Sequence, residues 1–263
     1  MSNLVCSITH LGTATIILEI GSLRLLTDPA FDPAGGKYSF GYGTGSKKLT
    51  APSISAEAIG QIDAVLLSHD HHADNLDNSG RAFLPKVKQV VTTSSGAKRL
   101  RNNAVGLPIW QSIELKSKDG LQVRVTATPA RHGPPLSRPL VGEVIGFILE
   151  WKGQQNGALY ISGDTVWFSG IAEVGKRFPI SLALLHLGGV RFPISGPLRY
   201  TFNGQEAIQA AKALNPKTII PIHYEGWTHF HEPRKESEKA FIQAGLDNRV
   251  LWLPLGVKTT VEL

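Results

Sequence analysis

The chain has 263 residues, of which 42% are hydrophobic and 18% are charged, so it is long and apolar enough to bury a large core. Its net charge is +6, but the basic residues are scattered, which argues against a nucleic-acid-binding protein and fits an anionic small molecule better. The single cysteine, Cys6, excludes an intramolecular disulfide and a cysteine-based zinc site.

The N-terminal residues carry no basic leader, and the apolar stretch at 16–20 is too short for a signal or membrane helix. We therefore expect a cytoplasmic protein without membrane insertion. The sequence does not fix the oligomeric state, so a homo-oligomer stays open.

The first part of the chain is predicted to be β-rich, with strands at 5–9, 15–19 and 23–26. A loop rich in glycine and aromatic residues covers 28–50. Within it, residues 41–47 lack the spacing and the preceding strand of a phosphate-binding loop. We interpret the whole segment as a loop on the substrate side of a site.

Helices and strands are interleaved over the rest of the chain. Helices are expected at 55–59, 75–84, 95–101, 203–214 and 232–244. Strands are expected at 64–67, 87–92, 123–127, 144–151, 158–161, 182–185, 218–222, 250–253 and 258–262. The strands cluster in two halves and no boundary resembles a linker, so we expect one domain over 1–263 with two packed sheets and helices outside.

Five apolar runs share one feature, because each ends at or just before a histidine or an aspartate. The residues reached in this way are His69, His132, Asp164, His186 and His223. Side chains at strand ends can converge on one rim of a sheet, and imidazole nitrogen and carboxylate oxygen are the ligands of hydrolytic metal sites. The sequence therefore predicts a metal site at these strand ends.

The first of these runs continues into a cluster of histidine and aspartate, His69-Asp70-His71-His72-Ala73-Asp74-Asn75. Side chains of an extended segment alternate, so His71 would lie on the same side as His69. His72 instead keeps a two-residue spacing to Asp74. Either His71 or His72 can therefore serve, together with His69, as the second metal-binding imidazole.

The cluster and the later strand ends resemble the metallo-β-lactamase superfamily, whose main motif is His-x-His-x-Asp-His. The resemblance spans residues 8–223. The segments 9–15, 26–29, 128–132 and 221–224 are similar to the branch that contains the ascorbate-6-phosphate lactonases and the N-acyl-phosphatidylethanolamine phospholipase D enzymes. The chain departs from the motif in one respect: one residue is inserted, and Asn75 stands where the final histidine belongs.

The resemblance implies an α/β fold, the four-layer αβ/βα sandwich, and a metal-dependent hydrolase that uses one or two Zn²⁺ ions. Mn²⁺ or iron stays open, because all the ligands are nitrogen or oxygen. The resemblance implies that His69, His71 or His72, and His132 hold one ion together with Asp164. Asp164 would bridge to a second ion held by Asp74 and His223, and a water activated by the metal would attack the substrate.

Further roles are assigned to seven residues at or near these ligands. Asp74 and His186 are candidate catalytic groups, since Asp74 can orient the water and accept its proton if the second ion is absent. Arg131 and Arg191 are candidates for holding an anionic substrate. Tyr224 is a candidate for lining the pocket. His229 and His231 are candidate proton donors to the leaving group.

Three functions remain open at this point. The first is a hydrolase of a small, anionic ester, lactone or phosphodiester. The second is a ribonuclease-like nuclease of the same superfamily, although no basic arm is visible. The third is a metal-binding sensor without turnover, which the replacement of histidine by Asn75 favours.

Overall fold

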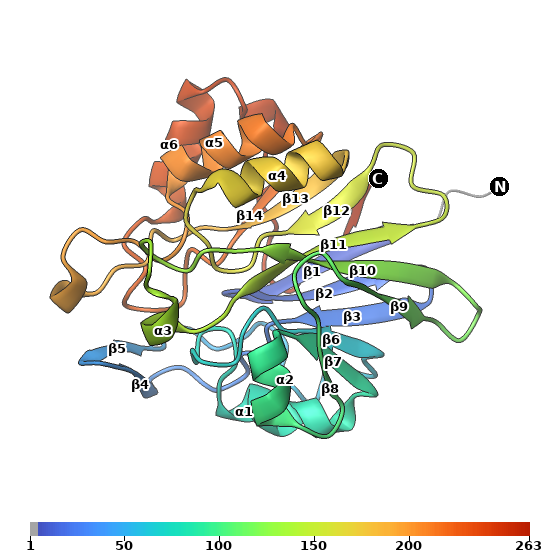
Figure 1. Ribbon diagram of the computed structural model, residues 1–263, viewed down its shortest axis with the longest axis horizontal. Coiled ribbons are helices and arrows are strands. Elements are labelled where there is room, and N and C mark those ends of the chain that lie inside the picture. Colours follow the sequence, from blue (N-terminus) through green and yellow to red (C-terminus); the bar gives the residue numbers. More distant parts are fainter. Residues whose placement is uncertain (1–4) are drawn as a thin grey trace.

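Two β-sheets lie face to face in the computed structural model, which describes residues 5–263 (Figure 1). The first sheet has seven strands, in the order β15 (Thr259–Val261), β1 (Cys6–Gly12), β2 (Thr15–Ile20), β3 (Leu23–Thr27), β6 (Ala64–Leu66), β7 (Gln89–Thr92) and β8 (Ala104–Gly106). The second has six, in the order β14 (Thr218–Ile222), β13 (Ile180–His186), β12 (Ala158–Ile161), β11 (Ile145–Trp151), β10 (Gln122–Pro129) and β9 (Ser112–Lys116).

Each sheet is antiparallel in one part and parallel in the other. Strands β1, β2 and β3 pair antiparallel, whereas β3, β6, β7 and β8 pair parallel. In the second sheet β12, β13 and β14 are parallel, and β10 runs in the same direction because β11 is antiparallel to both β10 and β12. The carboxyl ends of β10, β12, β13 and β14 therefore meet at one edge of this sheet.

The main core fills the space between the two sheets. It contains inward-facing residues of both, such as Ile8 and Leu18 of the first sheet and Val125, Phe147 and Leu184 of the second. All five are at most 1% exposed. Burial on this scale is the dominant favourable term in folding, and it fixes the rims of the two sheets relative to each other.

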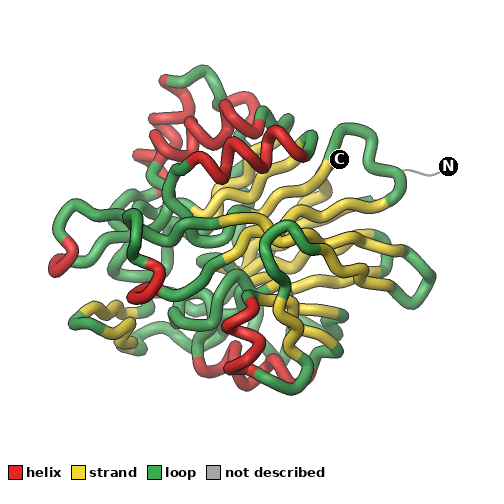
Figure 2. The backbone as a smooth tube through the Cα atoms, in the orientation of Figure 1, coloured by secondary structure: helices red, strands yellow, loops and turns green. Residues whose placement is uncertain are grey.

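Helices cover the outer faces of the sheets (Figures 1 and 2). The first sheet carries α1 (Asn78–Phe83) and α2 (Ser94–Leu100), and the second carries α4 (Ser169–Arg177), α5 (Gly204–Leu214) and α6 (Arg234–Gln243). A one-turn helix, α3 (Arg138–Val141), lies in the loop between β10 and β11. The predicted four-layer αβ/βα sandwich is confirmed.

Several segments differ from the sequence-based expectation, which did not include β8, β9, α3 or α4. The glycine-rich loop contains an antiparallel hairpin, β4 (Lys37–Gly41) and β5 (Thr44–Lys47). Residues 55–59 make a single turn and no helix. Residues 250–253 form no strand and make only an isolated bridge, Ile219 to Val250, beside the edge strand β14.

Among the described residues, 5–263, no helix has the length and apolar character needed to cross a membrane.

Candidate metal centre and substrate cavity

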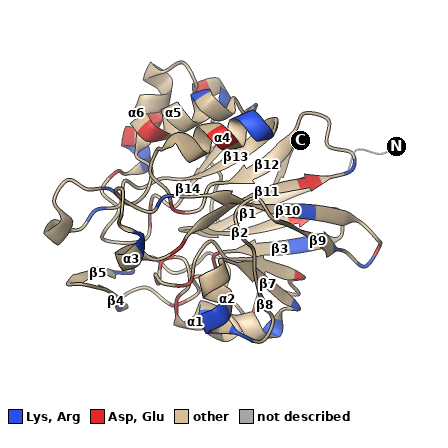
Figure 3. Ribbon diagram, viewed as in Figure 1, with Lys and Arg blue, Asp and Glu red and all other residues tan. Residues whose placement is uncertain are grey.

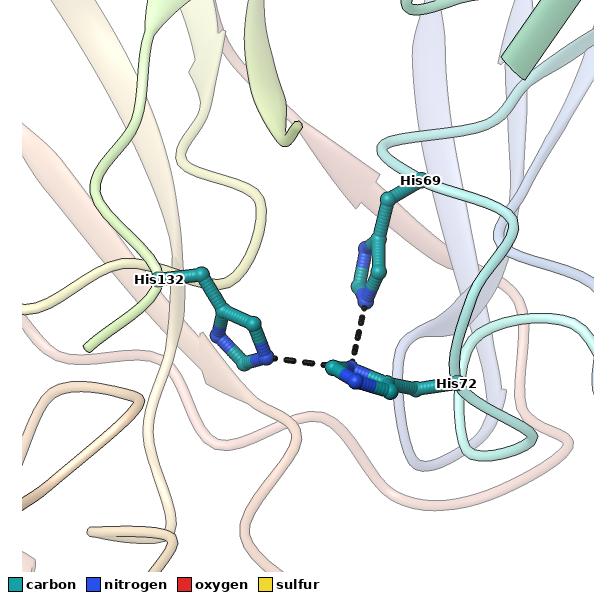
Figure 4. A group of neighbouring side chains, drawn as sticks. All are labelled: His69, His72 and His132. Carbon is teal, nitrogen blue, oxygen red and sulfur yellow. Dashed lines mark hydrogen bonds between the residues drawn. The ribbon is translucent and has the colours of Figure 1, made fainter. Parts of the chain in front are cut away.

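Three imidazoles converge at the rim of the two sheets (Figure 4). His69 follows β6, His132 follows β10, and His72 lies in the turn after His69. His72 Nδ1 is 3.2 Å from His69 Nε2 and 3.0 Å from His132 Nε2. Nitrogens bound to zinc at about 2.0–2.1 Å in a tetrahedron are about 3.3 Å apart, so the three atoms are spaced as ligands of one ion would be.

The local backbone explains why His72, and not His71, joins this group. The carbonyl of His72 accepts hydrogen bonds from the amides of Asn75, at 3.2 Å, and Leu76, at 2.9 Å. The segment is therefore a helical turn, and the alternation expected of an extended segment does not apply to it. The inserted residue is accommodated in the bend at Asp70 and His71 that precedes the turn.

His71 lies outside this group and is exposed, with its ring centroid 6.4 Å from that of His69 and 6.3 Å from that of His72. Its Nδ1 lies 3.7 Å from Asp70 Oδ1, and Arg99 holds that carboxylate with two hydrogen bonds of 2.6 and 2.8 Å. The ring packs on the backbone of Gly142, where an added Cβ would lie 2.2 Å from His71 Cε1. The two alternatives left by the sequence therefore occupy different surroundings.

Burial and hydrogen bonding prepare the three imidazoles for a metal. His132 Nδ1 donates to the Tyr200 carbonyl at 2.8 Å, so Nε2 carries the lone pair that faces His72. Burial lowers the pKa of His69 and His132 well below the usual value and that of His72 to about 4. All three are therefore neutral at pH 7, which is the form that binds a metal ion.

A second group combines Asp74, Asp164 and His223, and it comes from both sheets. Asp164 follows β12, and His223 follows β14 directly with a positive φ of 60°. His223 Nε2 is 3.3 Å from Asp74 Oδ2 and 3.5 Å from Asp164 Oδ1. All three side chains are almost completely buried.

The electrostatics of the second group favour a cation. Burial lowers the pKa of His223, but the charges of Asp164 and Asp74 outweigh it and raise the pKa to about 9. Burial raises the pKa of Asp164 to about 6. Asp74 Oδ1 and His223 Nε2 are buried without a hydrogen-bond partner. A divalent cation would satisfy both atoms and the two carboxylates, so the residues fit the metal that the motif implies.

His229 contacts the second group from a segment remote in sequence. Its Nε2 lies 2.9 Å from Asp74 Oδ2, and its Nδ1 lies 2.5 Å from Ser46 Oγ of β5. Burial raises the pKa of Asp74, but the imidazoles of His223 and His229 outweigh it and hold the pKa well below the usual value. The sequence indicated His229 only as a candidate proton donor. Its contact with Asp74 joins residues 155 positions apart, so no local sequence pattern predicts it.

Asn75, which replaces the last histidine of the motif, is buried beside the same group. Its Nδ2 is 3.5 Å from Asp164 Oδ1 and 3.5 Å from Ser68 Oγ, while its Oδ1 has no hydrogen-bond partner. The insertion therefore leaves position 75 facing the second group.

His186 and Asp28 lie buried beside the metal-binding groups. His186 Nδ1 is 3.1 Å from Ser162 Oγ, and its Nε2 is 3.6 Å from Asp28 Oδ2. Asp28 Oδ1 accepts the amide of Ser68 at 2.7 Å and so anchors the segment that leads to His69. The structure places His186 outside the lining of the substrate cavity. Asp28 lies in segment 26–29, one of the segments similar to the lactonase and phospholipase D branch, but the sequence predicted no role for it.

A cavity of about 360 Å³ opens above both groups, with His72, Asp74, His132 and His229 on its floor. Its walls come from the β4–β5 hairpin, from residues 134–141 and from residues 190–200. The walls are mainly apolar and include Phe40, Tyr42, Leu136, Leu140, Phe192 and Ile194. The glycine-rich segment thus lines this cavity, through its hairpin.

Arg131 and Tyr224 do not line this cavity. The Arg131 guanidinium donates to the Trp167 carbonyl at 2.7 Å and stacks over Phe168, with 5.1 Å to the ring centroid. Tyr224 is 4% exposed and packs edge-on against Trp252. Arg131 lines a smaller neighbouring hollow.

A mixed sandwich with a histidine-rich and carboxylate-rich rim defines the class of metal-dependent hydrolases with the metallo-β-lactamase fold. The sequence pattern of the beta-lactamase superfamily domain matches residues 23–224. A UPF0173 metal-dependent hydrolase of Methanoregula boonei is 32% identical over 227 residues, which cover 84% of this chain and 82% of that protein. The chain belongs to this superfamily and to its UPF0173 metal-dependent hydrolase family.

Solved structures agree on the fold. A possible metal-dependent hydrolase from Veillonella parvula superposes with a TM-score of 0.82 at 19% identity, covering 98% of this chain and 100% of that chain. The isothiocyanate hydrolase from Delia radicum gut bacteria superposes with a TM-score of 0.81 at 22% identity, covering 97% and 99%. The expected fold and the expected class of enzyme, a metal-dependent hydrolase, are confirmed.

Proposed function

We propose that this chain, with residues 1–263 acting as one domain, hydrolyses a carbon–oxygen or phosphorus–oxygen ester bond in a small molecule. The observation that carries the proposal is the position of two ligand groups at the floor of one cavity. The similarity of four sequence segments to the lactonase and phospholipase D branch favours ester-type bonds over other substrates.

In this proposal His69, His72 and His132 hold one ion, and Asp74, Asp164 and His223 hold the other. Zn²⁺, or Mn²⁺ or iron bound by the same ligands, would supply a water that is nucleophilic at neutral pH. The ion would also act as a Lewis acid on the substrate oxygen that gains negative charge.

The residues around the ions have complementary tasks. Asp74 lines the cavity, and if the second ion is absent it is the group that can orient the attacking water or accept its proton. His229 positions Asp74, and Ser46 positions His229. His186 and Asp28 support the segments from β13 and β6 from outside the cavity, which makes His186 a positioning residue in this proposal.

The nuclease is the weaker alternative. A mainly apolar cavity of about 360 Å³ suits a small substrate better than a polynucleotide, and in the view of Figure 3 Lys and Arg lie on several separate helices and strands. The sensor differs from the hydrolase only in turnover, so an activity measurement separates the two.

The test is turnover by the Zn²⁺-loaded protein on phenyl acetate, a γ-lactone, bis(p-nitrophenyl) phosphate and phenethyl isothiocyanate, with Asp164→Asn as the inactive variant. The isothiocyanate tests the activity named for one structural neighbour. Hydrolysis of an ester, lactone or phosphodiester that Asp164→Asn abolishes supports the proposal. A metal-loaded wild type that hydrolyses none of these three overturns it.

A further inference from the structure

The cavity above the ligand groups has two chemically different parts. Its floor carries the polar side chains of the site, including Asp74 and His229. Its walls carry aromatic and aliphatic side chains that approach the floor closely. Phe40 lies 5.3 Å from both His72 and His229, and Phe192 stacks on His229 at 5.5 Å, measured between ring centroids. An apolar surface therefore begins immediately beside the reactive position.

The apolar surface continues to the mouth of the cavity. Tyr42, Leu136 and Ile194 lie there with exposed fractions of 70%, 95% and 69%. Three large apolar side chains from three separate segments meet around one opening. Apolar groups gathered around a cavity mouth mark a place where an apolar ligand enters.

Charged groups that would hold an anion are missing from the walls. Among the lining residues, all within the described part of the chain, there is no Lys, Arg or Glu, and the single carboxylate is Asp74 of the ligand group. Three nearby arginines are engaged elsewhere: Arg131 with Trp167 and Phe168, Arg138 of α3 with Glu143 at 2.8 Å, and Arg199 with Glu206 at 3.2 Å. Arg191, the other arginine proposed to hold an anion, does not line the cavity. A charged substrate group beyond the metal would lose its hydration without gaining a partner.

From these observations we infer that the substrate carries an uncharged apolar group, a short alkyl chain or an aryl ring, next to the hydrolysed bond. This group lies against Phe40 and Phe192, which pack edge to face at 5.8 Å between ring centroids, and the reacting bond lies over the floor. The inference rests on the proposed function for the reaction that the site performs. The preference of the cavity for an uncharged apolar group does not rest on it. It replaces the sequence-based expectation of an anionic substrate held by Arg131.

The first arm of the test measures turnover by the Zn²⁺-loaded protein. Methyl acetate, methyl butyrate and methyl hexanoate form a neutral series, and monomethyl adipate matches the hexanoate in chain length but ends in a carboxylate. We expect kcat/KM to rise about fourfold for each added methylene and the adipate to be at least about tenfold poorer than the hexanoate. A flat series, or a preference for the adipate, overturns the inference.

The second arm introduces a cation at the cavity wall. Leu198 lines the cavity and is 45% exposed, whereas Leu255 is 42% exposed and lies outside it. Leu198→Lys should raise the ratio of adipate to hexanoate turnover about tenfold, while Leu255→Lys should leave the ratio unchanged. Equal effects of both substitutions would contradict the location of the apolar group.

The third arm measures binding without chemistry. Hexanamide and the monoamide of adipic acid are titrated into Zn²⁺-loaded Asp164→Asn by calorimetry, and we expect the neutral amide to bind at least about tenfold more tightly. Tight binding of hexanamide with no turnover of any ester overturns the proposed function and leaves the inference standing. Preferred binding of the anionic amide overturns the inference and leaves the proposed function standing.

Discussion

His229 Nε2 lies 2.9 Å from Asp74 Oδ2, although the two residues are 155 positions apart. The contact joins the loop after β14 to the turn after β6, and therefore one sheet to the other. It also places an imidazole beside a metal-group carboxylate in a chain that lacks the last histidine of its motif. Several consequences of this arrangement can be measured.

His229 should control the affinity of the second metal group. His229→Ala removes the partner of Asp74, and we expect the second ion to bind about 10–100-fold more weakly. His229→Gln keeps an N–H donor and should restore part of the affinity. Titration of the apo protein with Zn²⁺ measures both. His231→Ala is the control, since the His231 side chain is exposed; an equal loss in that variant would argue against the role of His229.

The two candidate histidines of the motif should behave differently. His72→Ala removes a member of the converging triad, so we expect loss of the first ion and a fall in kcat/KM of at least about 100-fold. His71→Ala leaves the triad intact and should retain both metal content and activity. Elemental analysis and kinetics of the two purified variants show which histidine binds the first ion. The reverse pattern would mean that His71 is the ligand.

The second ion should be held less tightly than the first. Three imidazoles surround the first position, whereas Asn75 stands beside Asp164 in place of an imidazole at the second. After mild dialysis we expect about one ion per chain. Asn75→His should raise that number, because position 75 faces the second group. Two tightly held ions in the wild type would contradict this prediction.

The stability of the apo protein should depend on the protonation of His10. Burial lowers its pKa from 6.5 to about 4 in the folded state. Between these values the unfolded chain binds a proton that the folded chain does not, so the contribution of His10 is complete above pH 6.5 and is lost as the pH falls to 4.

The measurable quantity is the slope of the unfolding free energy with pH. Denaturant titrations from pH 6.5 to 4 should give a slope for His10→Asn that is smaller by about 1.4 kcal/mol per pH unit than for the wild type. His231→Asn, at an exposed position, should keep the wild-type slope. Identical slopes for the wild type and His10→Asn would rule out the burial effect.

The sequence predicted many of the strands and helices because the evidence for them is local, and the resemblance to the metallo-β-lactamase superfamily implied the four-layer sandwich. Apolar runs, turn residues and helix caps act over a few positions, as in the capping box of Asn203 and Glu206 that begins α5. The positions of His69, Asp164 and His223 at strand ends could be predicted for the same reason, since the end of an apolar run is itself a local signal.

The choice between His71 and His72 was decided by the tertiary structure. A single inserted residue allows two spacings. The helical turn after His72 places that ring with His69 and His132, and the contacts of Asp70 with Arg99 and of His71 with Gly142 hold His71 outside the group. The hairpin at 37–47 was likewise missed, because a two-stranded ribbon with a polar and glycine-rich sequence depends on the surface it packs against.

The sequence by itself determined most of the strands and helices and which ligands stand at their ends, because hydrophobic periodicity and strand termini are properties of neighbouring residues. The tertiary structure alone decided that Arg131 turns toward Trp167, that His229 meets Asp74, and that Phe40 and Phe192 make the cavity apolar. These contacts join segments distant in the chain, and which of them form depends on the packing of the two sheets, which no short stretch of sequence encodes.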